Sequence, residues 1–450
     1  GGYKLIKSVS PNDGKAFANW SSASDFEISE TLVRLSIGTN RLAADLNLRS
    51  EVLNTAIKAL EEASEELVEQ IQKEVGKTPA EANDEIPYAV SFLQVALNLV
   101  NNYHFQVRKN KRVISEVSRG VGLLISPYND PLAGLTRKIA PCLAAGAAAI
   151  VKPSELGVQC ALTLKRIFSD AGLDQYISIL PIAEYDRVTK LMAVEEIGTV
   201  SFTGSSEVGL SLAAKASAAG KGFVGELGGT NPFVLMEDAD LDCAIPDLIS
   251  RKIKAAGQAC SSFNIVLAER NIVDEVSERT VSALSKVVFG PSDYFVQMGP
   301  VRTSDMVKRL DALGTKIISE QGKLLYRGKQ QISDGFIAPP AAYQVPSPGL
   351  LASTEIFGPL FGICAFDEFK NLRASLSANR QPLVLYVYGQ NKAKIDELLY
   401  GLRYGSIGVN TTAIQGPEVP TGGFGQAGIG REGGVWGMRE FLTTINRMEE

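Results

Sequence analysis

A cysteine within a run of small residues is the first candidate for chemistry in this sequence. Cys260 stands in Gly257-Gln258-Ala259-Cys260-Ser261-Ser262, where small side chains would let a substrate approach the backbone closely. A thiolate is a good nucleophile toward a carbonyl carbon when its pKa is lowered. Considered alone, Cys260 is better explained as a buried small hydrophobic residue, because free cysteine is among the most buried residue types.

A carboxylate before paired glycines is the second candidate. Glu226 stands in Gly225-Glu226-Leu227-Gly228-Gly229-Thr230-Asn231-Pro232, which leads into an apolar run at 233–236. The glycines permit positive φ and close backbone approach. A carboxylate in such a dry turn should have a raised pKa, which suits a general base. Considered alone, the segment is equally well explained as a domain-boundary turn with an incidental Glu.

An asparagine that follows a predicted strand is the third candidate. Asn129 stands in Ser126-Pro127-Tyr128-Asn129-Asp130-Pro131-Leu132. Its side-chain N–H could stabilise an oxyanion together with a backbone N–H at the nucleophile. An Asx turn before proline explains the same pattern.

Two further segments indicate a nucleotide site. Val151-Lys152-Pro153-Ser154-Glu155 ends a predicted strand with a cation and a carboxylate, at the sheet edge where open α/β folds bind ligands. Phe202-Thr203-Gly204-Ser205-Ser206 ends the next strand and opens a helix, whose N-terminus could bind a pyrophosphate. The G-x-G-x-x-G fingerprint is absent, so a search limited to it would miss this site.

Composition limits the class of protein. At 450 residues the chain exceeds what one hydrophobic core organises, so two or three domains are expected. A formal net charge of −5 provides no field that would attract nucleic acid or an anionic membrane. No apolar run approaches the ~20 residues that span a bilayer, and the start, Gly1-Gly2-Tyr3-Lys4, lacks an export signal. We therefore expect a cytoplasmic protein without nucleic-acid or membrane partners.

Cysteine and histidine usage excludes several kinds of site. The five cysteines stand far apart without a CxxC pair, which suits reduced thiols better than disulfides or zinc, so no metal site is expected. His104 is the single histidine and has no nucleophile motif beside it. We expect it to pack rather than react. Acid–base chemistry then falls to Glu, Asp, Lys or Cys.

Hydrophobic periodicity predicts the elements that would position these residues. Residues 49–74 have the spacing of one long amphipathic helix, and a second helix covers 86–99. The basic, β-branched segment 106–117 is interpreted as a surface strand or hairpin rather than an anion site. Short apolar runs then alternate with helices, which predicts parallel sheets and two α/β domains that meet near 225–230. Predicted strands span 121–126, 147–152, 199–203, 232–236, 265–268, 362–366 and 384–388, and predicted helices span 137–145, 155–171, 206–219, 239–256 and 272–288.

Together these segments resemble the aldehyde dehydrogenase superfamily over essentially the whole chain, and they look nearest to succinate-semialdehyde-dehydrogenase-like members. The separation of base and nucleophile, 260 − 226 = 34 positions, also looks like that family's. The resemblance implies an α/β fold with two Rossmann-like parallel-sheet domains, one cofactor-binding and one catalytic, plus a small β oligomerisation element. The implied assignment is 1–105 and 119–227 to NAD(P) binding, 228–425 to catalysis, and 106–118 with 438–450 to an oligomerisation hairpin and C-terminal strand.

The resemblance also implies residue roles. Cys260 would add to the aldehyde, Asn129 would hold the oxyanion, and Glu226 would activate the water that releases the acid. Lys138 and Glu432 match positions proposed in the family as a proton exit path. Residues matching the family's cofactor site are Ser126, Lys152, Ser154, Glu155, Gly204, Ser205, Leu227, Glu355 and Phe357.

Glu155 bears on the choice of cofactor, because a carboxylate at the ribose favours a free 2′-hydroxyl. We expect NAD, with NADP as the alternative. Three departures from the family pattern mark an atypical branch. The segment 180–186 lacks the usual glycines, Asp130 puts a carboxylate near the oxyanion site, and Ser262-Phe263-Asn264-Ile265 follows the nucleophile.

Two basic residues bear on the aldehyde. In the succinate-semialdehyde group an arginine at the position of Arg137 binds the distal carboxylate, and Lys254 occupies a second basic position. Such a pair suits a small semialdehyde with a carboxylate, sulfonate or phosphonate, although helix caps or surface salt bridges would explain both. The serine that completes that site is replaced around Gln415-Gly416. A CoA-acylating enzyme and a catalytically silent member remain alternatives, and a homodimer or homotetramer is expected.

Overall fold

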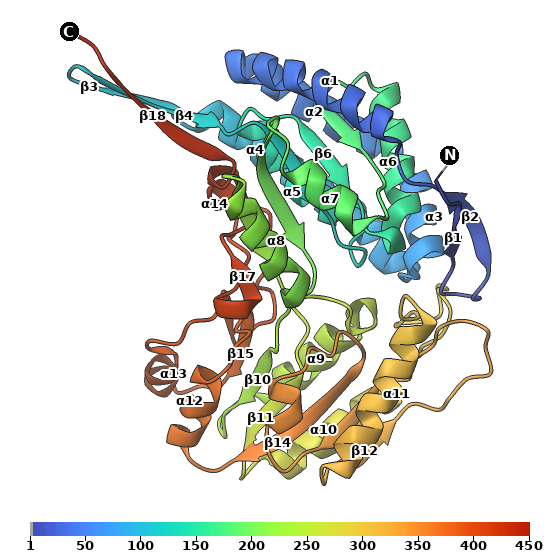
Figure 1. Cartoon of the computed structure of the whole chain (residues 1–450). Helices are drawn as coiled ribbons and strands as arrows, with labels where there is room; N and C mark the ends of the chain where they lie inside the picture. The colour runs from blue at the N-terminus through green and yellow to red at the C-terminus, as the bar shows by residue number, and fades with distance from the viewer. Residues whose placement is uncertain (1–2) are drawn as a thin grey trace.

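Two large and mostly parallel β-sheets organise the protein, with helices packed on both (Figure 1). The computed structural model describes residues 3–450. Gly1 and Gly2, which the sequence assigns to the first domain, lie outside the described residues. The two sheets and their helices confirm the predicted α/β fold class.

The first sheet has the strand order β17-β9-β8-β5-β6-β7, and all neighbours are parallel except β17 and β9. Its central strand has the sequence VGLLI with every residue buried, which is typical of a strand covered on both faces. The strands are β5 (Val121–Ile125), β6 (Ala149–Lys152), β7 (Ile177–Ile179), β8 (Ile197–Thr203), β9 (Gly222–Glu226) and β17 (Gly428–Ile429).

Crossover helices and an N-terminal helical layer cover this sheet. The crossovers are α5 (Ala133–Ala144), α6 (Val158–Asp170), α7 (Tyr185–Met192) and α8 (Ser206–Ala218). Before them come the hairpin β1 (Ile6–Val9) and β2 (Ala16–Trp20), then α1 (Asp25–Ala44), α2 (Leu46–Glu62), α3 (Ser64–Val75) and α4 (Pro79–Asn102). α4 packs extensively against α5, which makes α4 a neighbour of the sheet's ligand-binding edge.

The second sheet has the order β12-β13-β14-β11-β10-β15-β16 and is parallel except for β12 and β13. Side chains alternate between its faces: Phe233 and Leu235 join one core cluster, and Val234 joins the other. The strands are β10 (Pro232–Leu235), β11 (Ile265–Glu269), β12 (Lys323–Arg327), β13 (Ala341–Gln344), β14 (Leu360–Phe366), β15 (Val384–Tyr388) and β16 (Ser406–Val409). The helices are α9 (Leu241–Ile253), α10 (Val273–Ser285), α11 (Ser304–Ser319), α12 (Phe369–Ser377) and α13 (Lys392–Leu399).

The chain crosses between the two sheets twice near the predicted domain junction. It leaves the first sheet at Glu226 and enters the second at Pro232. It returns as β17, which pairs with β9 directly beside Glu226. The predicted boundary at 227/228 falls in the first crossing, whereas β17 lies in a stretch that the sequence did not assign.

A three-stranded antiparallel sheet, β18-β4-β3, projects from the body (Figure 1). It consists of β3 (Gln106–Lys109), β4 (Arg112–Ser118) and β18 (Leu442–Met448), which follows the short helix α14 (Gly434–Arg439). This confirms the predicted hairpin and terminal strand. Within residues 3–450, no helix combines the length and apolar character needed to cross a bilayer.

Two predicted helices were too long. The helix predicted at 49–74 is two helices that break at Ala63, because a second helix begins at Ser64 with an acidic first turn that suits a new N-terminus. The helix predicted at 239–256 ends at Ile253, because Ala255 and Ala256 take a left-handed backbone. The sequence also made no prediction for α1, α7, α11, α12 and α13.

Candidate active site

A cavity of about 1000 Å³ lies between the two large sheets, at the carboxyl ends of β5, β6, β8 and β9. β5 pairs with β6 on one side and with β8 on the other, so the chain reverses its direction along the sheet here. Open α/β sheets bind ligands at such a point. Every predicted site residue lines the cavity except Lys138, which lies behind it.

The backbone before Cys260 passes through three consecutive left-handed residues. Ala255, Ala256 and Gly257 have φ of 49°, 54° and 75°. A non-glycine residue in this conformation costs about 1–3 kcal/mol. A Cβ on Gly257 would lie 2.2 Å from the carbonyl oxygen of Gly358, so only glycine fits there. This turn ends the helical segment and directs Cys260 into the cavity.

Buried donors hold the carbonyls around the nucleophile. The Asn231 side-chain amide donates to the carbonyl oxygens of Cys260 and Ser262, at 2.7 and 2.6 Å. The Tyr386 hydroxyl donates to the carbonyl oxygen of Ser261 at 2.6 Å. Because Asn231 belongs to the same turn as Glu226, one segment positions both the carboxylate and the thiol.

The environment of Cys260 opposes thiolate formation in the free protein. Burial raises the pKa of its thiol well above the ordinary value, and the nearby carboxylate of Glu226 raises it further. The guanidinium of Arg137 acts in the opposite direction. The thiol therefore needs a base or additional hydrogen-bond donors to react near neutral pH.

Glu226 ends β9 and is almost fully buried, with 4% of its surface exposed. Burial raises the pKa of its carboxyl, the neighbouring Glu432 adds to this, and Arg137 lowers it. One oxygen lies 3.9 Å from the Arg137 guanidinium. The other, Oε1, has no hydrogen-bond partner among the described residues. A buried carboxylate with a free oxygen and a raised pKa can accept a proton from water.

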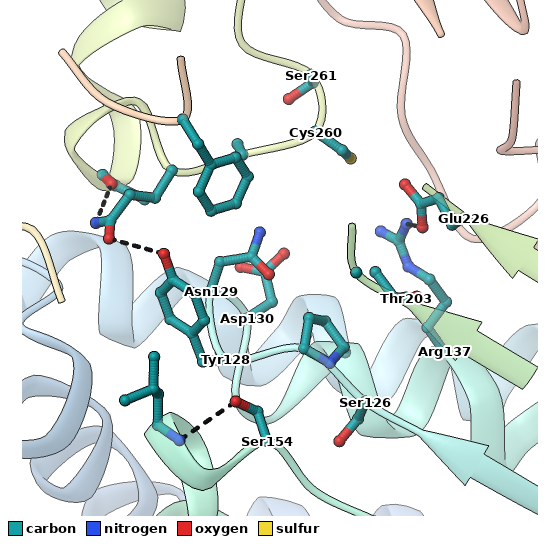
Figure 2. A pocket seen from close by; sticks show the side chains of 18 of the residues that line it. Ser126, Tyr128, Asn129, Asp130, Arg137, Ser154, Thr203, Glu226, Cys260 and Ser261 are labelled. Carbon is teal, nitrogen blue, oxygen red and sulfur yellow. Dashed lines mark hydrogen bonds and ion pairs between the residues drawn. The ribbon is translucent and has the colours of Figure 1, made fainter. Parts of the chain in front are cut away.

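Asn129 lies on the loop between β5 and α5 and faces the same cavity as Cys260 and Glu226 (Figure 2). The carboxylate that the sequence placed beside it, Asp130, is neutralised by Lys77 at 2.6 Å. Lys77 also contacts Glu85 at 2.6 Å. Although burial acts to raise the pKa of Asp130, Lys77 holds it below the ordinary value.

The Lys77 ion pairs also support the start of α5. Glu85 accepts the backbone N–H groups of Leu132 and Ala133 at 2.7 and 3.0 Å. The helix has no side-chain cap of its own, so this carboxylate on α4 satisfies its first amides. The loop that carries Asn129 is thus tied to α4 by charge.

Arg137 and Lys138 both extend from α5 and are already engaged. The Arg137 guanidinium donates to the Tyr88 hydroxyl at 2.5 Å and lies 5.0 Å from the centre of the Phe92 ring. The Lys138 ammonium donates to the Ser201 hydroxyl at 2.8 Å and pairs with Glu432. Glu226 and Glu432 are both buried and influence each other electrostatically, and Glu432 in turn pairs with Lys138.

Lys254, the second predicted substrate residue, is exposed at the entrance of the cavity. The predicted cofactor residues line the same cavity. The hydroxyl of Ser126 is buried and finds no partner within residues 3–450, which leaves a donor for a ligand. Ser205 caps α8 by accepting the amide of Val208 at 3.3 Å, and the start of this helix faces the cavity.

The remaining cofactor candidates also border the cavity. Lys152 is half-buried and Glu155 is exposed, both at the carboxyl end of β6. Burial raises the pKa of Glu355 to about 7, with the Gly229 amide and Arg309 acting against it. A Cβ on Gly228 would lie 2.6 Å from the Glu355 carboxylate, so the glycine allows this approach. A free hydroxyl, a helix N-terminus and a carboxylate at the sheet edge fit a dinucleotide.

Several site residues were not predicted. Lys77 and Glu85 lie on α4 and the turn before it, and no local motif marks them. Gln415 contacts Cys260, and Arg251 contacts Ser261 next to it. Arg251 stands nine positions before the nucleophile, on a helix that was predicted to continue beyond its actual end at Ile253. Only a correct prediction of that helix end could have indicated that Arg251 lies near the site.

The chain is similar to known proteins over most of its length. The sequence model described as "Aldehyde dehydrogenase family" matches residues 2–446. Succinate-semialdehyde dehydrogenase of Paenarthrobacter nicotinovorans is 30% identical over 406 residues, which cover 88% of this chain and 90% of the relative. 3-Sulfolactaldehyde dehydrogenase of Pseudomonas putida is 29% identical, with 88% of this chain and 83% of the relative covered. The crystal structure of an aldehyde dehydrogenase from Brucella melitensis biovar abortus superposes with a TM-score of 0.93 at 29% identity, covering 99% and 94% of the two chains.

Proposed function

Because the chain belongs to the aldehyde dehydrogenase family, whose members oxidise aldehydes with NAD or NADP, we propose that Cys260 and Glu226 carry out this oxidation through a covalent thioester. The observation that carries the proposal is the convergence of three groups on one cavity. The thiol of Cys260, the amide of Asn129 and the partly free carboxylate of Glu226 all face it (Figure 2).

The steps follow from these positions. The thiolate of Cys260 adds to the aldehyde carbon, and the oxyanion that forms is stabilised by the Asn129 amide and the Cys260 backbone N–H. Bound NAD(P) supplies the acceptor for the hydride that the substrate carbon then loses. Cys260 retains the acyl group as a thioester. Glu226 removes a proton from water, which attacks the thioester and releases the acid and the thiol.

The proton taken by Glu226 has a buried route away from the thioester. Glu432 adjoins Glu226 electrostatically, and its own carboxylate pairs with Lys138. Glu432 Oε2 has no hydrogen-bond partner in the described part of the chain, so it can accept a proton. We propose Glu226, Glu432 and Lys138 as the exit path.

The residues that would hold the cofactor divide between its two ends. Lys152, Glu155 and Ser205 would hold the adenosine and pyrophosphate end, and Glu355 would hold the nicotinamide ribose. Glu155 is free and exposed, so it would accept hydroxyl donors from a ribose and repel a 2′-phosphate. We therefore propose NAD as the preferred cofactor, with NADP as the alternative.

The proposed substrate is a small aldehyde with a distal anionic group. The relatives named above act on succinate semialdehyde and 3-sulfolactaldehyde by their names, and both aldehydes carry an anion. Of the cations lining the cavity, Lys254 and Arg137 are the two that we assign to this anionic group. Arg137 already contacts Glu226 at 3.9 Å, so it would be shared between base and substrate.

A kinetic assay with two variants tests the mechanism. Purified protein is given NAD or NADP and a panel of semialdehydes, with and without CoA, and NADH is followed by absorbance. Cys260→Ala should abolish oxidation. Glu226→Gln should give one rapid burst of NADH per subunit and then at least about 100-fold slower turnover, because the thioester forms but is not hydrolysed. Full activity of Cys260→Ala, or a strict requirement for CoA, would contradict the proposal.

The pH profile of turnover provides an independent check. Burial raises the pKa of Glu226, so the base is lost at a higher pH than an exposed carboxylate would be. Turnover of the wild-type protein should fall as pH drops through this raised pKa. The slow residual turnover of Glu226→Gln should lack that limb.

We also propose that the projecting sheet joins subunits into a homodimer or homotetramer. Apolar side chains on it are exposed in the single chain, including Val107 (56%), Ile445 (52%) and Met448 (58%). Analytical ultracentrifugation tests this, since Ile445→Lys should lower the association constant. The five free thiols favour a reducing compartment, and we propose the cytosol.

A further inference from the structure

Gln415 reaches the reacting sulfur atom. Its side-chain Nε2 lies 3.5 Å from the Sγ of Cys260, and within residues 3–450 no other side chain donates a hydrogen bond to that atom. Both residues line the cavity. A thiol sulfur is a weak acceptor, but a thiolate carries a full charge, and hydrogen bonds to charged groups are about twice as strong as neutral ones.

Arg251 holds the loop of Gln415 against the loop of Cys260. One end of its guanidinium donates to the Ser261 hydroxyl at 2.9 Å, and the other donates to the carbonyl oxygen of Thr412 at 2.8 Å. These partners lie one residue after Cys260 and three residues before Gln415. A single planar group therefore sets the distance between the two loops.

The far side of the Gln415 loop is also anchored. The amide of Gly434 donates to the carbonyl oxygen of Pro417 at 3.0 Å, so the loop is held on both sides of Gln415. Gln415 itself is half-buried. An amide held in this way loses little freedom when it binds a charge.

The charged groups around the Cys260 sulfur do not by themselves stabilise a thiolate, so a neutral hydrogen-bond donor can contribute. Glu226 and Asp130 disfavour a thiolate, and Arg137 favours it but is already engaged with Glu226. A further cation here would pair with Glu226 and remove the base. An amide N–H stabilises the thiolate without adding charge.

We propose that Gln415 is a catalytic residue that donates its amide N–H to the Cys260 thiolate before addition to the aldehyde, and that Arg251 is the positioning residue that holds it there. The proposal rests on the proposed function, because it takes Cys260 as the nucleophile. When the carbon–sulfur bond forms, the negative charge moves from sulfur to the carbonyl oxygen and thus to Asn129. The Gln415 amide therefore stabilises the negative charge while it is on sulfur, and the Asn129 amide stabilises it once it is on the carbonyl oxygen.

The expected size of the effect follows from thiolate chemistry. Each pKa unit by which Gln415 lowers the thiol pKa raises the thiolate fraction about tenfold at neutral pH, while a Brønsted coefficient of about 0.4–0.5 makes that thiolate about threefold less nucleophilic. The net gain is about threefold per unit below the pKa. Above the pKa, the same donor slows the reaction.

The test is the pH dependence of Cys260 alkylation by iodoacetamide in protein without cofactor, followed by peptide mass spectrometry. In this reaction a carbon–sulfur bond forms and iodide leaves, so no turnover is required. Gln415→Met removes the donor at similar length and should slow alkylation at pH 7.5 about threefold, with a higher apparent pKa. Gln415→Glu adds a charge of the wrong sign and should slow it at least tenfold. Arg251→Lys should give a smaller change in the same direction.

Two controls make the outcome decisive. Gln381→Met removes an amide that donates to Ser206 instead, and it should leave the alkylation profile unchanged. Gln415→Asn keeps the amide but shortens the side chain, so its alkylation profile should resemble that of Gln415→Met. This variant replaces Gln415→Met as the test if Gln415→Met does not fold. Unchanged rates and apparent pKa in folded Gln415 variants would overturn the proposal. Failure of the proposed function would show separately, as aldehyde oxidation that survives in Cys260→Ala.

Discussion

The loop that carries Asn129 and the loop that carries Cys260 face each other across the cavity, yet different interactions hold them. The first is held by charge: Lys77 bridges Asp130 and Glu85. The second is held by backbone conformation, with left-handed residues packed against a neighbouring carbonyl, and by hydrogen bonds from Asn231 and Tyr386 to its carbonyl oxygens. An ion pair depends on protonation, whereas a steric fit does not. The two loops should therefore fail under different conditions.

Removing the central charge of the first loop should have the largest effect on stability. Lys77→Met leaves the buried carboxylate of Glu85 beside the partly exposed carboxylate of Asp130, and removal of one partner from a buried ion pair such as Lys77–Glu85 costs about 3–5 kcal/mol. Chemical denaturation at pH 7.5 measures this loss. Asp130→Asn added to Lys77→Met should recover part of this loss, because the buried Glu85 carboxylate then has no second carboxylate beside it.

The loss in Lys77→Met should shrink as pH falls. Burial already raises the pKa of Glu85 in the wild-type protein, and without Lys77 the pKa values of Glu85 and Asp130 both rise, so the folded variant binds more protons than the unfolded chain and gains stability toward low pH. In the wild-type protein the pKa of Asp130 lies below its ordinary value, so that contribution to stability is lost as pH falls through this lowered pKa. Between pH 8 and pH 5 the difference in free energy of unfolding between the two proteins should narrow because the variant gains stability, and the wild-type loss from Asp130 adds to this only at more acidic pH. A gap that is constant between pH 8 and pH 5 would show that charge does not hold this loop.

Disrupting the second loop should lower the free energy of unfolding slightly less than Lys77→Met does, and this loss should not depend on pH. Gly257→Ala places a Cβ against the Gly358 carbonyl and forces a left-handed alanine. Together these cost about 2–5 kcal/mol, the sum of the left-handed penalty and overpacking. Denaturation at pH 8 and pH 5 should give the same loss. Gly220→Ala is a matched control, since it also has a left-handed backbone but open space around it.

Relieving the backbone strain of the second loop should have the smallest effect, and this effect should be an increase in stability. Ala255 has a positive φ that glycine adopts freely, so Ala255→Gly should stabilise the protein by up to about 1 kcal/mol. The entropy of the unfolded chain opposes this gain. The informative readout is activity: if the strained turn keeps Cys260 in place, kcat should fall while stability rises. An increase in both would mean that the strain has no role in positioning.

The comparison also explains what could be predicted from the sequence. The motif segments around Asn129, Glu226 and Cys260 became candidates because each places a reactive side chain beside turn residues, and their roles followed from the resemblance of the set to the aldehyde dehydrogenase superfamily. The alternation of strands and helices predicted the parallel sheets. Chemistry and local backbone are encoded within a few residues. These features therefore survive without any knowledge of tertiary contacts.

The residues that position these motif segments could not be predicted in this way, because they contact the segments only through tertiary packing. Lys77 and Glu85 meet Asp130 only after α4 packs against α5, so the sequence suggested an isolated carboxylate where the structure has a neutralised one. Ala255 and Ala256 favour helix by propensity, and tertiary packing overrides that preference here. Gln415 reaches Cys260 from 155 positions away.

The late strands β17 and β18 have a consequence for how the protein is made. β17 closes the edge of the first sheet at β9, β18 completes the projecting sheet, and Glu432 lies between them as the partner of Lys138. Translation delivers these segments after nearly everything they contact. A nascent chain on the ribosome would expose an open strand edge and a buried ammonium without its carboxylate until residues 428–448 emerge. Ribosome-bound intermediates of this protein should therefore be clients of chaperones, and competence for catalysis should be the last property that synthesis confers.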